Sequence, residues 1–309
     1  MRPNAIAGVL PLLLVTALVG CGGSNSDDAS SEKANAPDAK KLLQQTFGPN
    51  EKASSGTLSG NVNINVKGAP RYREPIRITL SGPFEQSGSA PEANLSVSLA
   101  RGGSPLGGEL VLVDDQVLIG LGTTGYRVPD DIAATIRRPL ANSDNALTSV
   151  LGVFGIAPHR WARKPRVVGN EEIAGVDTIH GSAQIGKERF FLDVARLTKI
   201  LTKLRITEVT GLPREVDREA RVALARSVTS ATGNVWTGAD DKVLRKASFD
   251  MKLKPSAKDR RTLGFSSMTV DGELTVTDVG RPQKIEAPPS RGSYDALQIT
   301  LDALAESAR

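Results

Sequence analysis

Alternation of apolar and polar residues, repeated in three stretches of the first hundred residues, constrains the fold more than any other feature. Apart from Gly60, residues 58–66, 76–81 and 95–99 place an aliphatic residue at every second position, with Ser, Asn, Thr or Arg between them. Because successive side chains of a strand point to opposite faces, each stretch has one buried face and one wet face. This pattern is typical of antiparallel sheets, since a parallel sheet covered on both faces needs continuous apolar runs.

The rest of the chain predicts further strands. They are expected at residues 109–113, 117–121, 126–128, 166–169, 176–185, 231–237, 243–253 and 268–276. The last of these passes through Asp271-Gly272, which is also a hairpin signal. A two-residue hairpin there would place Val270 opposite Glu273, so we predict one continuous strand.

Helical spacing of apolar residues predicts helices between these strands. The expected ranges are 38–47, 129–136, 144–154, 188–204, 214–228 and 293–307. Asp38, Ser143 and Ser293 are the expected N-caps of the first, third and last of them. Strands, then helices, then strands and a final helix indicate an α+β fold.

An apolar segment at the amino terminus ends at Cys21, which is the only cysteine of the chain. It follows Arg2 and is shorter than the ~20 apolar residues of a membrane span, as is typical of a secretory signal. The sequence Leu18-Val19-Gly20-Cys21 looks like a bacterial lipobox, in which the thiol is alkylated by diacylglycerol before cleavage. We therefore expect residues 1–20 to be a lipoprotein signal peptide and Cys21 to carry acyl chains such as palmitate. The protein is then anchored through membrane lipid to the extracytoplasmic face of the cell membrane.

The segment after the cysteine lacks large apolar side chains. Residues 21–37 are therefore expected to form a flexible tether, because they cannot bury enough surface to order themselves. Residues 38–309 are long enough to bury a core as a single domain without disulfides. The formal net charge of +5 is too small and too dispersed to indicate a nucleic-acid partner.

Three phrases resemble one group of proteins: Gly-Val-Asp-Thr-Ile-His at 175–180, Val-Trp-Thr-Gly-Ala-Asp-Asp-Lys-Val-Leu-Arg at 235–245, and Gly-Arg-Pro-Gln-Lys-Ile-Glu-Ala-Pro at 280–288. Together with the lipobox they are similar to actinobacterial envelope lipoproteins of the LppX and LprG type, within the LolA-like superfamily. The resemblance implies a strongly curved antiparallel sheet, an unclosed half-barrel, with helices packed over its concave face. It also implies a single LolA-like domain at 38–309, with the C-terminal helix as an addition, that holds acyl chains between sheet and helices.

The helix at 144–154 and the segment behind it are the expected wall of such a lipid site. The candidate ligand contacts are Leu147, Val150, Leu151, Phe154, Ile156 and Trp161. The same apolar stripe fits an ordinary filled core, because only a hollow beneath it would make it a lipid wall. The neighbouring basic residues either form a solvated loop or face anionic membrane headgroups. They are Arg160, Arg163, Lys164 and Arg166.

Motifs that carry catalytic or cofactor chemistry are incomplete. Gly-Leu-Gly-Thr-Thr-Gly at 120–125 has dinucleotide-fingerprint spacing, but an extended segment follows where a helix must begin. The two histidines, His159 and His180, are far apart and have no cysteine partner, so no metal site is expected. We expect no enzyme and no cofactor. The favoured function is a non-catalytic binder or carrier of a lipid or other hydrophobic ligand. The alternative is a ligand-free envelope interaction or sensory domain, and the protein partner stays unknown.

Overall fold

One twelve-stranded sheet forms the centre of the computed structural model, which describes residues 28–307 apart from 89, 102–104, 142–144 and 211. The predicted signal peptide and Cys21 lie outside the described residues. The strands are β1 Ser55–Lys67, β2 Ile76–Ser87, β3 Ala90–Arg101, β4 Leu106–Val113, β5 Gln116–Leu121, β6 Thr124–Arg127, β7 Ala162–Ile173, β8 Val176–Ile185, β9 Val228–Gly238, β10 Leu244–Leu253, β11 Ser267–Thr277 and β12 Ser290–Gly292.

The order of the strands leaves the sheet open. It runs β12-β6-β5-β4-β3-β2-β1-β11-β10-β9-β8-β7, so β12 and β7 are its two edges. All neighbours pair antiparallel except β12 and β6, which are parallel. The predicted α+β fold with an unclosed, curved antiparallel sheet is thereby confirmed. β11 is one continuous strand, as predicted, and Val270 lies between Ile64 and Met251.

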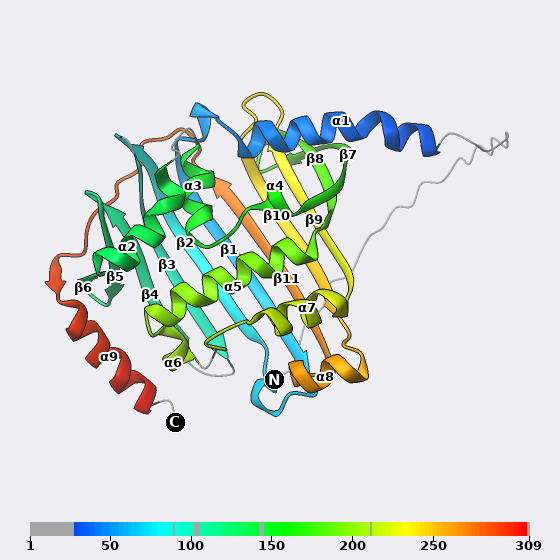
Figure 1. Ribbon diagram of the computed structural model, residues 1–309. Helices are drawn as coiled ribbons and strands as arrows, with labels where there is room; N and C mark the ends of the chain where they lie inside the picture. Colours follow the sequence, from blue (N-terminus) through cyan, green and yellow to red (C-terminus); the bar gives the residue numbers. More distant parts are fainter. Residues whose placement is uncertain (1–27, 89, 102–104, 142–144, 211, 308–309) are drawn as a thin grey trace, which may run out of the picture.

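The helices lie mainly on one face of the sheet. Figure 1 shows α2 to α7 in front of the strands, α1 across one end, α8 at the other end and α9 beside the β6 edge. Their bounds are α1 Asp28–Phe47, α2 Asp130–Arg137, α3 Ala146–Val153, α4 Pro158–Trp161, α5 Lys187–Lys203, α6 Ile206–Thr210, α7 Arg218–Ser227, α8 Ala257–Leu263 and α9 Tyr294–Ser307. Short 3-10 turns within the described ranges accompany them, namely η1 Glu51–Ala53, η2 Pro70–Tyr72 and η3 Arg138–Ala141.

The starts of α1 and α3 differ from the sequence prediction. α1 begins at Asp28 and not at Asp38, so residues 28–37 of the predicted tether are helical. α3 begins at Ala146, because the side-chain oxygen of Asn145 accepts the backbone N–H of Thr148 at 3.0 Å. Asn145 is therefore the N-cap, and the prediction of Ser143 was wrong. The last helix starts as predicted, since the Ser293 hydroxyl accepts the backbone N–H of Ala296.

The bounds of several other elements also differ from those predicted from the sequence. The predicted helix at 214–228 starts only at Arg218, where Asp217 accepts the backbone N–H of Ala220 at 2.8 Å. Residues 158–161, for which neither a helix nor a strand was predicted, form α4. The sequence did not predict α8, whose N-cap is Ser256 and whose last turn ends at Gly264 with a φ of 70°. β7 is longer than its predicted core at 166–169.

The core is divided into three clusters. The largest joins α2 and α3 to the inner face of β1–β5 and contains Leu58, Phe84, Leu95, Leu147 and Val150. The second lies beneath α5, α7 and α8 and contains Phe190, Phe191, Met251, Leu253 and Phe265. The third lies on the opposite face of β4 and β5, where Ala287 of the C-terminal arm covers Val111, Val113 and Leu118. No described helix is both long enough and apolar enough to cross a membrane.

Candidate functional site

The apolar face of α3 packs directly onto the sheet. Leu147 and Val150 have no exposed surface and Leu151 has 1%. Their backbone neighbours are β1, β2 and β3, and they share one buried cluster with Leu58 and Leu95. A side chain without accessible surface borders no hollow large enough for a water molecule. This end of the inner face is therefore filled, and contact of these three residues with a lipid stays a prediction that requires α3 to move.

The other three predicted ligand contacts are half-buried. Phe154 and Ile156 pack against the same cluster as α3. Trp161 packs against the second cluster, with its ring 5.1 Å from that of Phe190 in an edge-on arrangement. The six residues thus line two separate parts of the inner face, and the structure does not bring them together as one wall.

A buried carboxylate positions Trp161. The indole N–H of Trp161 donates to Asp193 of α5 at 3.0 Å, and Arg196 donates to the same carboxylate at 2.8 Å. Arg189 lies at 3.9 Å from it. On the other side of α4, the ring of His159 stacks on Phe47 of α1, with centroids 5.6 Å apart. Burial lowers the pKa of the His159 imidazole. Through these two side-chain contacts, α4 connects α1 with α5.

Beyond α3, the inner face of β1–β3 carries aliphatic side chains that are only half-buried. The register places Val62 opposite Ile78 and Ile78 opposite Leu99, on the same face as the buried Leu58 and Leu95. The half-buried residues are Val62, Ile64, Ile78, Val97 and Leu99. In the described part of the chain, none of the five belongs to a buried cluster or packs against one.

α5 supplies a second set of such residues from above. Leu197 and Leu201 are half-buried and lie on the same helical face as the buried Phe190 and Leu204. Whereas α3 rests on strands, the main backbone neighbours of α5 are α2, α4, α6 and α7. Figure 1 shows α5 crossing in front of the middle strands. We call the two sets the inner aliphatic surface, which consists of Val62, Ile64, Ile78, Val97, Leu99, Leu197 and Leu201.

Sequence reasoning found the parts of this surface but not the surface itself. The alternating strands and the apolar stripe of the helix at 188–204 were both predicted, but the helix expected to cover a lipid on the sheet was the one at 144–154 and not the one at 188–204. Because its side chains are aliphatic and partly accessible from two layers, the surface can contact an apolar ligand and has no group to polarise or cleave one.

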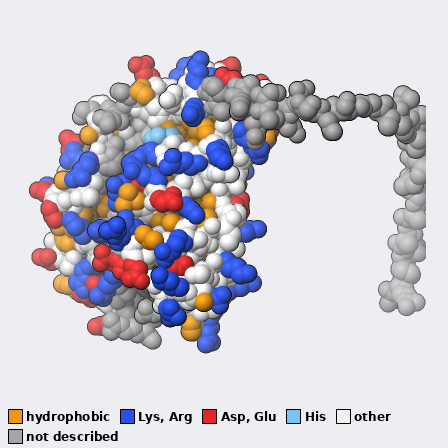
Figure 2. Space-filling model, turned by 45° about the vertical axis from the view of Figure 1, so that its right-hand side comes forward, with side chains coloured by type: hydrophobic (Ala, Val, Ile, Leu, Met, Phe, Trp, Pro, Cys, Tyr) orange, Lys and Arg blue, Asp and Glu red, His pale blue; other side chains and the backbone are white. Residues whose placement is uncertain are grey.

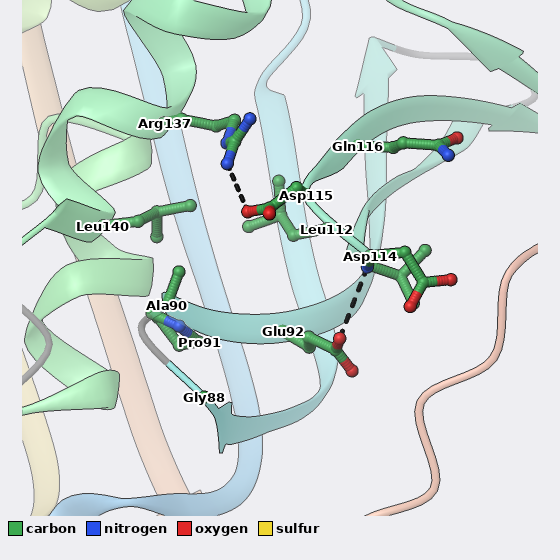
Figure 3. Close-up of a pocket in the computed structure, with 11 residues that line it drawn as sticks. Gly88, Ala90, Pro91, Glu92, Leu112, Asp114, Asp115, Gln116, Arg137 and Leu140 are labelled. Carbon is green, nitrogen blue, oxygen red and sulfur yellow. Dashed lines mark hydrogen bonds and ion pairs between the residues drawn. The ribbon is translucent and has the colours of Figure 1, made fainter.

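A pocket of about 270 Å³ lies elsewhere, at the ends of the β2–β3 and β4–β5 hairpins (Figure 3). Arg137 of α2 forms an ion pair with Asp115, and the backbone N–H of Asp114 donates to Glu92 at 3.3 Å. The apolar part of the pocket lining comes from Leu112 and other residues on the sheet side, and from Leu140 on the helix side. Charged groups dominate its rim, and none of the predicted site residues lines it.

On the outer face of the sheet, His180 is held in a satisfied network. Its Nδ1 is 2.8 Å from Glu171, its ring stacks on Trp236 with centroids 4.4 Å apart, and the Trp236 indole N–H donates to the same carboxylate at 2.8 Å. The bond from Trp236 is the main cause that lowers the pKa of Glu171. His180 is thus half-buried, and both of its ring nitrogens have a hydrogen-bonding partner. Among the residues that the structure describes, no group of His, Cys, Asp and Glu could hold a metal ion.

The four predicted headgroup contacts are exposed. Arg160 is on α4, and Arg163, Lys164 and Arg166 are at the start of β7. Lys164 has a φ of 48° at an irregularity of the β7–β8 pairing. Because α4 contacts α5, this segment adjoins that helix. Its contact with a membrane stays a prediction.

When the chain is compared with known proteins, the matches are to solved structures. No family model and no curated protein matches the chain. LprF from Mycobacterium bovis is 14% identical with a TM-score of 0.41, over 82% of this chain and 98% of LprF. The lipoprotein LppX from Mycobacterium tuberculosis is 13% identical with a TM-score of 0.40, over 81% of this chain and 99% of LppX. A putative outer membrane lipoprotein-sorting protein domain from Vibrio parahaemolyticus is 7% identical with a TM-score of 0.24, over 88% and 100%. The resemblance to the LppX and LprG type thus recurs among solved structures, but similarities this low carry no argument about ligand, site or activity.

Proposed function

We propose that this chain is an extracytoplasmic lipoprotein that holds the acyl chains of a lipid on the inner aliphatic surface and catalyses no reaction. The half-burial of that surface is the observation that carries the proposal. Apolar area removed from water contributes about 25 cal/mol per Å², so aliphatic side chains left half-covered between two layers are a binding surface for apolar matter. An alkyl chain laid along them removes the remaining area from water.

The dimensions of the surface favour a chain-like ligand. Val62, Ile78 and Leu99 are opposite one another on three adjacent strands, which lie about 4.8 Å apart. The row therefore spans roughly 10 Å, which is the length of an alkyl segment rather than of a compact head group. All seven side chains lack a hydrogen-bond donor or acceptor, so the part of the ligand they contact must be apolar.

The amino terminus supports the same proposal. A lipobox ending at Cys21 places the chain at a membrane, where lipids are the available apolar ligands. We propose that Cys21 is the anchor and that the described domain receives or releases lipid beside that membrane. Two acyl chains give the durable attachment that a single one does not provide.

Substitution at two positions tests the proposal. Val97→Trp fills the inner aliphatic surface, where Gly108 of β4 is the opposite residue. We expect this variant to lose most of the lipid that co-purifies with the wild type, with little change in the urea midpoint. Val150→Trp is the matched control in the filled region, where overpacking costs about 1–3 kcal/mol. Lipid extraction with mass spectrometry and urea unfolding measure the two effects.

A different pair of results would contradict lipid binding on this surface. A wild type that never carries lipid, together with a Val97→Trp variant destabilised as much as Val150→Trp, means that both positions are ordinary core. That result rejects the carrier and leaves the ligand-free envelope interaction or sensory domain.

A further inference from the structure

The positive charge of the chain is concentrated on three neighbouring helices. α5, α7 and α8 together contain eleven Lys and Arg and four Asp and Glu, a surplus of seven, whereas the surplus of the whole chain is five. α7 contacts α5 on one side and α8 on the other. We call the outward side of these three helices the basic helical face.

Half of the acidic residues on these helices are turned inward. Asp193 is 4% exposed and Asp259 is 6% exposed. Each is occupied within the fold, since Asp193 accepts from Trp161 and Asp259 accepts from Ser256 and Arg226. Among the described residues, no ion pair neutralises five exposed cations of this face, which are Lys199, Lys203, Arg218, Lys258 and Arg261. Figure 2 shows Lys and Arg outnumbering Asp and Glu across the side of the molecule that it presents.

An exposed apolar residue stands in line with these cations. Val222 of α7 is 45% exposed, and Arg218 and Arg226 lie one turn before it and one turn after it. A single exposed valine is ordinary on a soluble surface. Next to Arg218, which forms no ion pair among the described residues, it has the arrangement of an interfacial helix, in which the apolar side chain enters the headgroup layer and the basic stem extends to the phosphates.

We infer that the basic helical face docks onto a bilayer surface that carries anionic lipid headgroups. The exposed basic residues of α4 and early β7 adjoin α5 and extend this face. α5 also contributes Leu197 and Leu201 to the inner aliphatic surface. Docking therefore places that surface directly behind the helix that touches the bilayer. This consequence rests on the proposed function, whereas the docking itself does not.

Vesicle binding tests the inference. The chain from residue 21 with Cys21→Ser keeps every described contact, because residues 1–27 lie outside them. It should sediment with vesicles of equal parts phosphatidylglycerol and phosphatidylcholine at low salt, and not with phosphatidylcholine alone. Each Lys or Arg near an anionic surface contributes about 1 kcal/mol, roughly fivefold in affinity. The triple variant Lys199→Glu, Arg218→Glu and Lys258→Glu should therefore bind at least about a hundredfold more weakly.

A matched triple variant separates the face from net charge. Lys41→Glu, Lys52→Glu and Arg291→Glu change the charge equally at exposed positions outside the three helices. This control should bind nearly as the wild type does. Equal losses in the two triple variants, equal binding to neutral vesicles, or no binding to either vesicle overturns the inference.

A single thiol gives an independent readout. Because the chain contains only one cysteine, Val222→Cys in the Cys21→Ser background can be labelled with a polarity-sensitive dye. Its emission should shift to the blue on anionic vesicles, while that of Ser59→Cys on the outer face of β1 should not. A shift at Ser59→Cys and none at Val222→Cys contradicts the docking, even if lipid still co-purifies and the proposed function stands.

Discussion

At the scale of single residues, Asp193 explains how a charged group can sit inside an apolar layer. Its carboxylate accepts hydrogen bonds from Trp161 and Arg196 and lies near Arg189, so its lone pairs are largely used within the fold. A buried charge without such partners costs several kcal/mol, which is why buried carboxylates are paired or hydrogen-bonded. The result is a fixed junction between α4 and α5. Leu197 follows one turn beyond Asp193 on α5, so this junction fixes the height of the helix over the inner aliphatic surface.

We expect the single residue Cys21 to hold the protein at the membrane. A chain that lacks residues 1–20 and carries Cys21→Ala should be recovered in the soluble fraction, while the wild type stays with washed membranes. The reason is that acyl chains provide about 0.8 kcal/mol per buried methylene, and no described helix can replace them by spanning the bilayer. Washing in high salt removes attachment by the basic helical face and isolates the contribution of the anchor. Retention of the variant equal to that of the wild type after such washing disproves the lipid anchor.

At the scale of elements, the junction of α5 and α6 holds the C-terminal helix. Arg205 occupies the left-handed region with a φ of 59° and donates to Glu208 of α6 and to Gln298 and Asp302 of α9. The hydrogen bond to Glu208, followed by the charge of Asp302, raises the pKa of its guanidinium. The Tyr294 hydroxyl donates to the carbonyl oxygen of Lys203 at 3.0 Å. α9 is therefore attached both by these polar bonds and by its buried Leu297 and Leu301.

We expect Arg205→Ala to loosen α9 without unfolding the sheet. The variant loses the hydrogen bonds to three acceptors at once, so α9 keeps only its apolar packing through Leu297 and Leu301 and its other polar bonds, and local opening costs less. Hydrogen exchange should rise at residues 294–307 and stay unchanged in β1 and β11. Arg214→Ala is the control, because that side chain is 72% exposed and only 3.7 Å from Glu208. Exchange in α9 that does not differ between the two variants contradicts this role of Arg205.

Local periodicity explains which elements the sequence could predict. The strands of residues 58–99 were found because apolar side chains recur at every second position. α8 was missed because its seven residues contain four charged ones and only Leu263 and Ala257 as apolar positions, which gives no helical stripe. The start of α1 was missed because residues 28–37 lack the large apolar side chains that would mark a buried face. Capping chemistry recovers α8 afterwards, through Ser256 and Gly264.

At the scale of the whole molecule, the location of the candidate site could not be predicted from alternation. Leu58 and Val62 are on the same strand and the same face, yet Leu58 is fully buried and Val62 is half-buried. The difference arises from what lies above them, since α3 packs on the strands at one end and α5 packs mainly on other helices at the other. Such layering depends on contacts between distant parts of the chain, which a local pattern does not contain. For this reason the predicted wall on α3 and the inner aliphatic surface differ.

We expect a bound lipid to stabilise the folded molecule as a whole. A ligand that binds only the folded state stabilises it by RT ln(1 + [L]/Kd), which is about 2.7 kcal/mol at a ligand concentration of 100 Kd. Delipidated protein should therefore melt at a lower temperature than protein saturated with a long-chain fatty acid. The difference should vanish in Val97→Trp, because the indole occupies the space that the alkyl chain covers. A matched Ser96→Trp on the exposed outer face of β3 should keep the full difference. If fatty acid raises the melting temperature of wild type and Val97→Trp equally, the ligand binds somewhere other than between β1–β3 and α5.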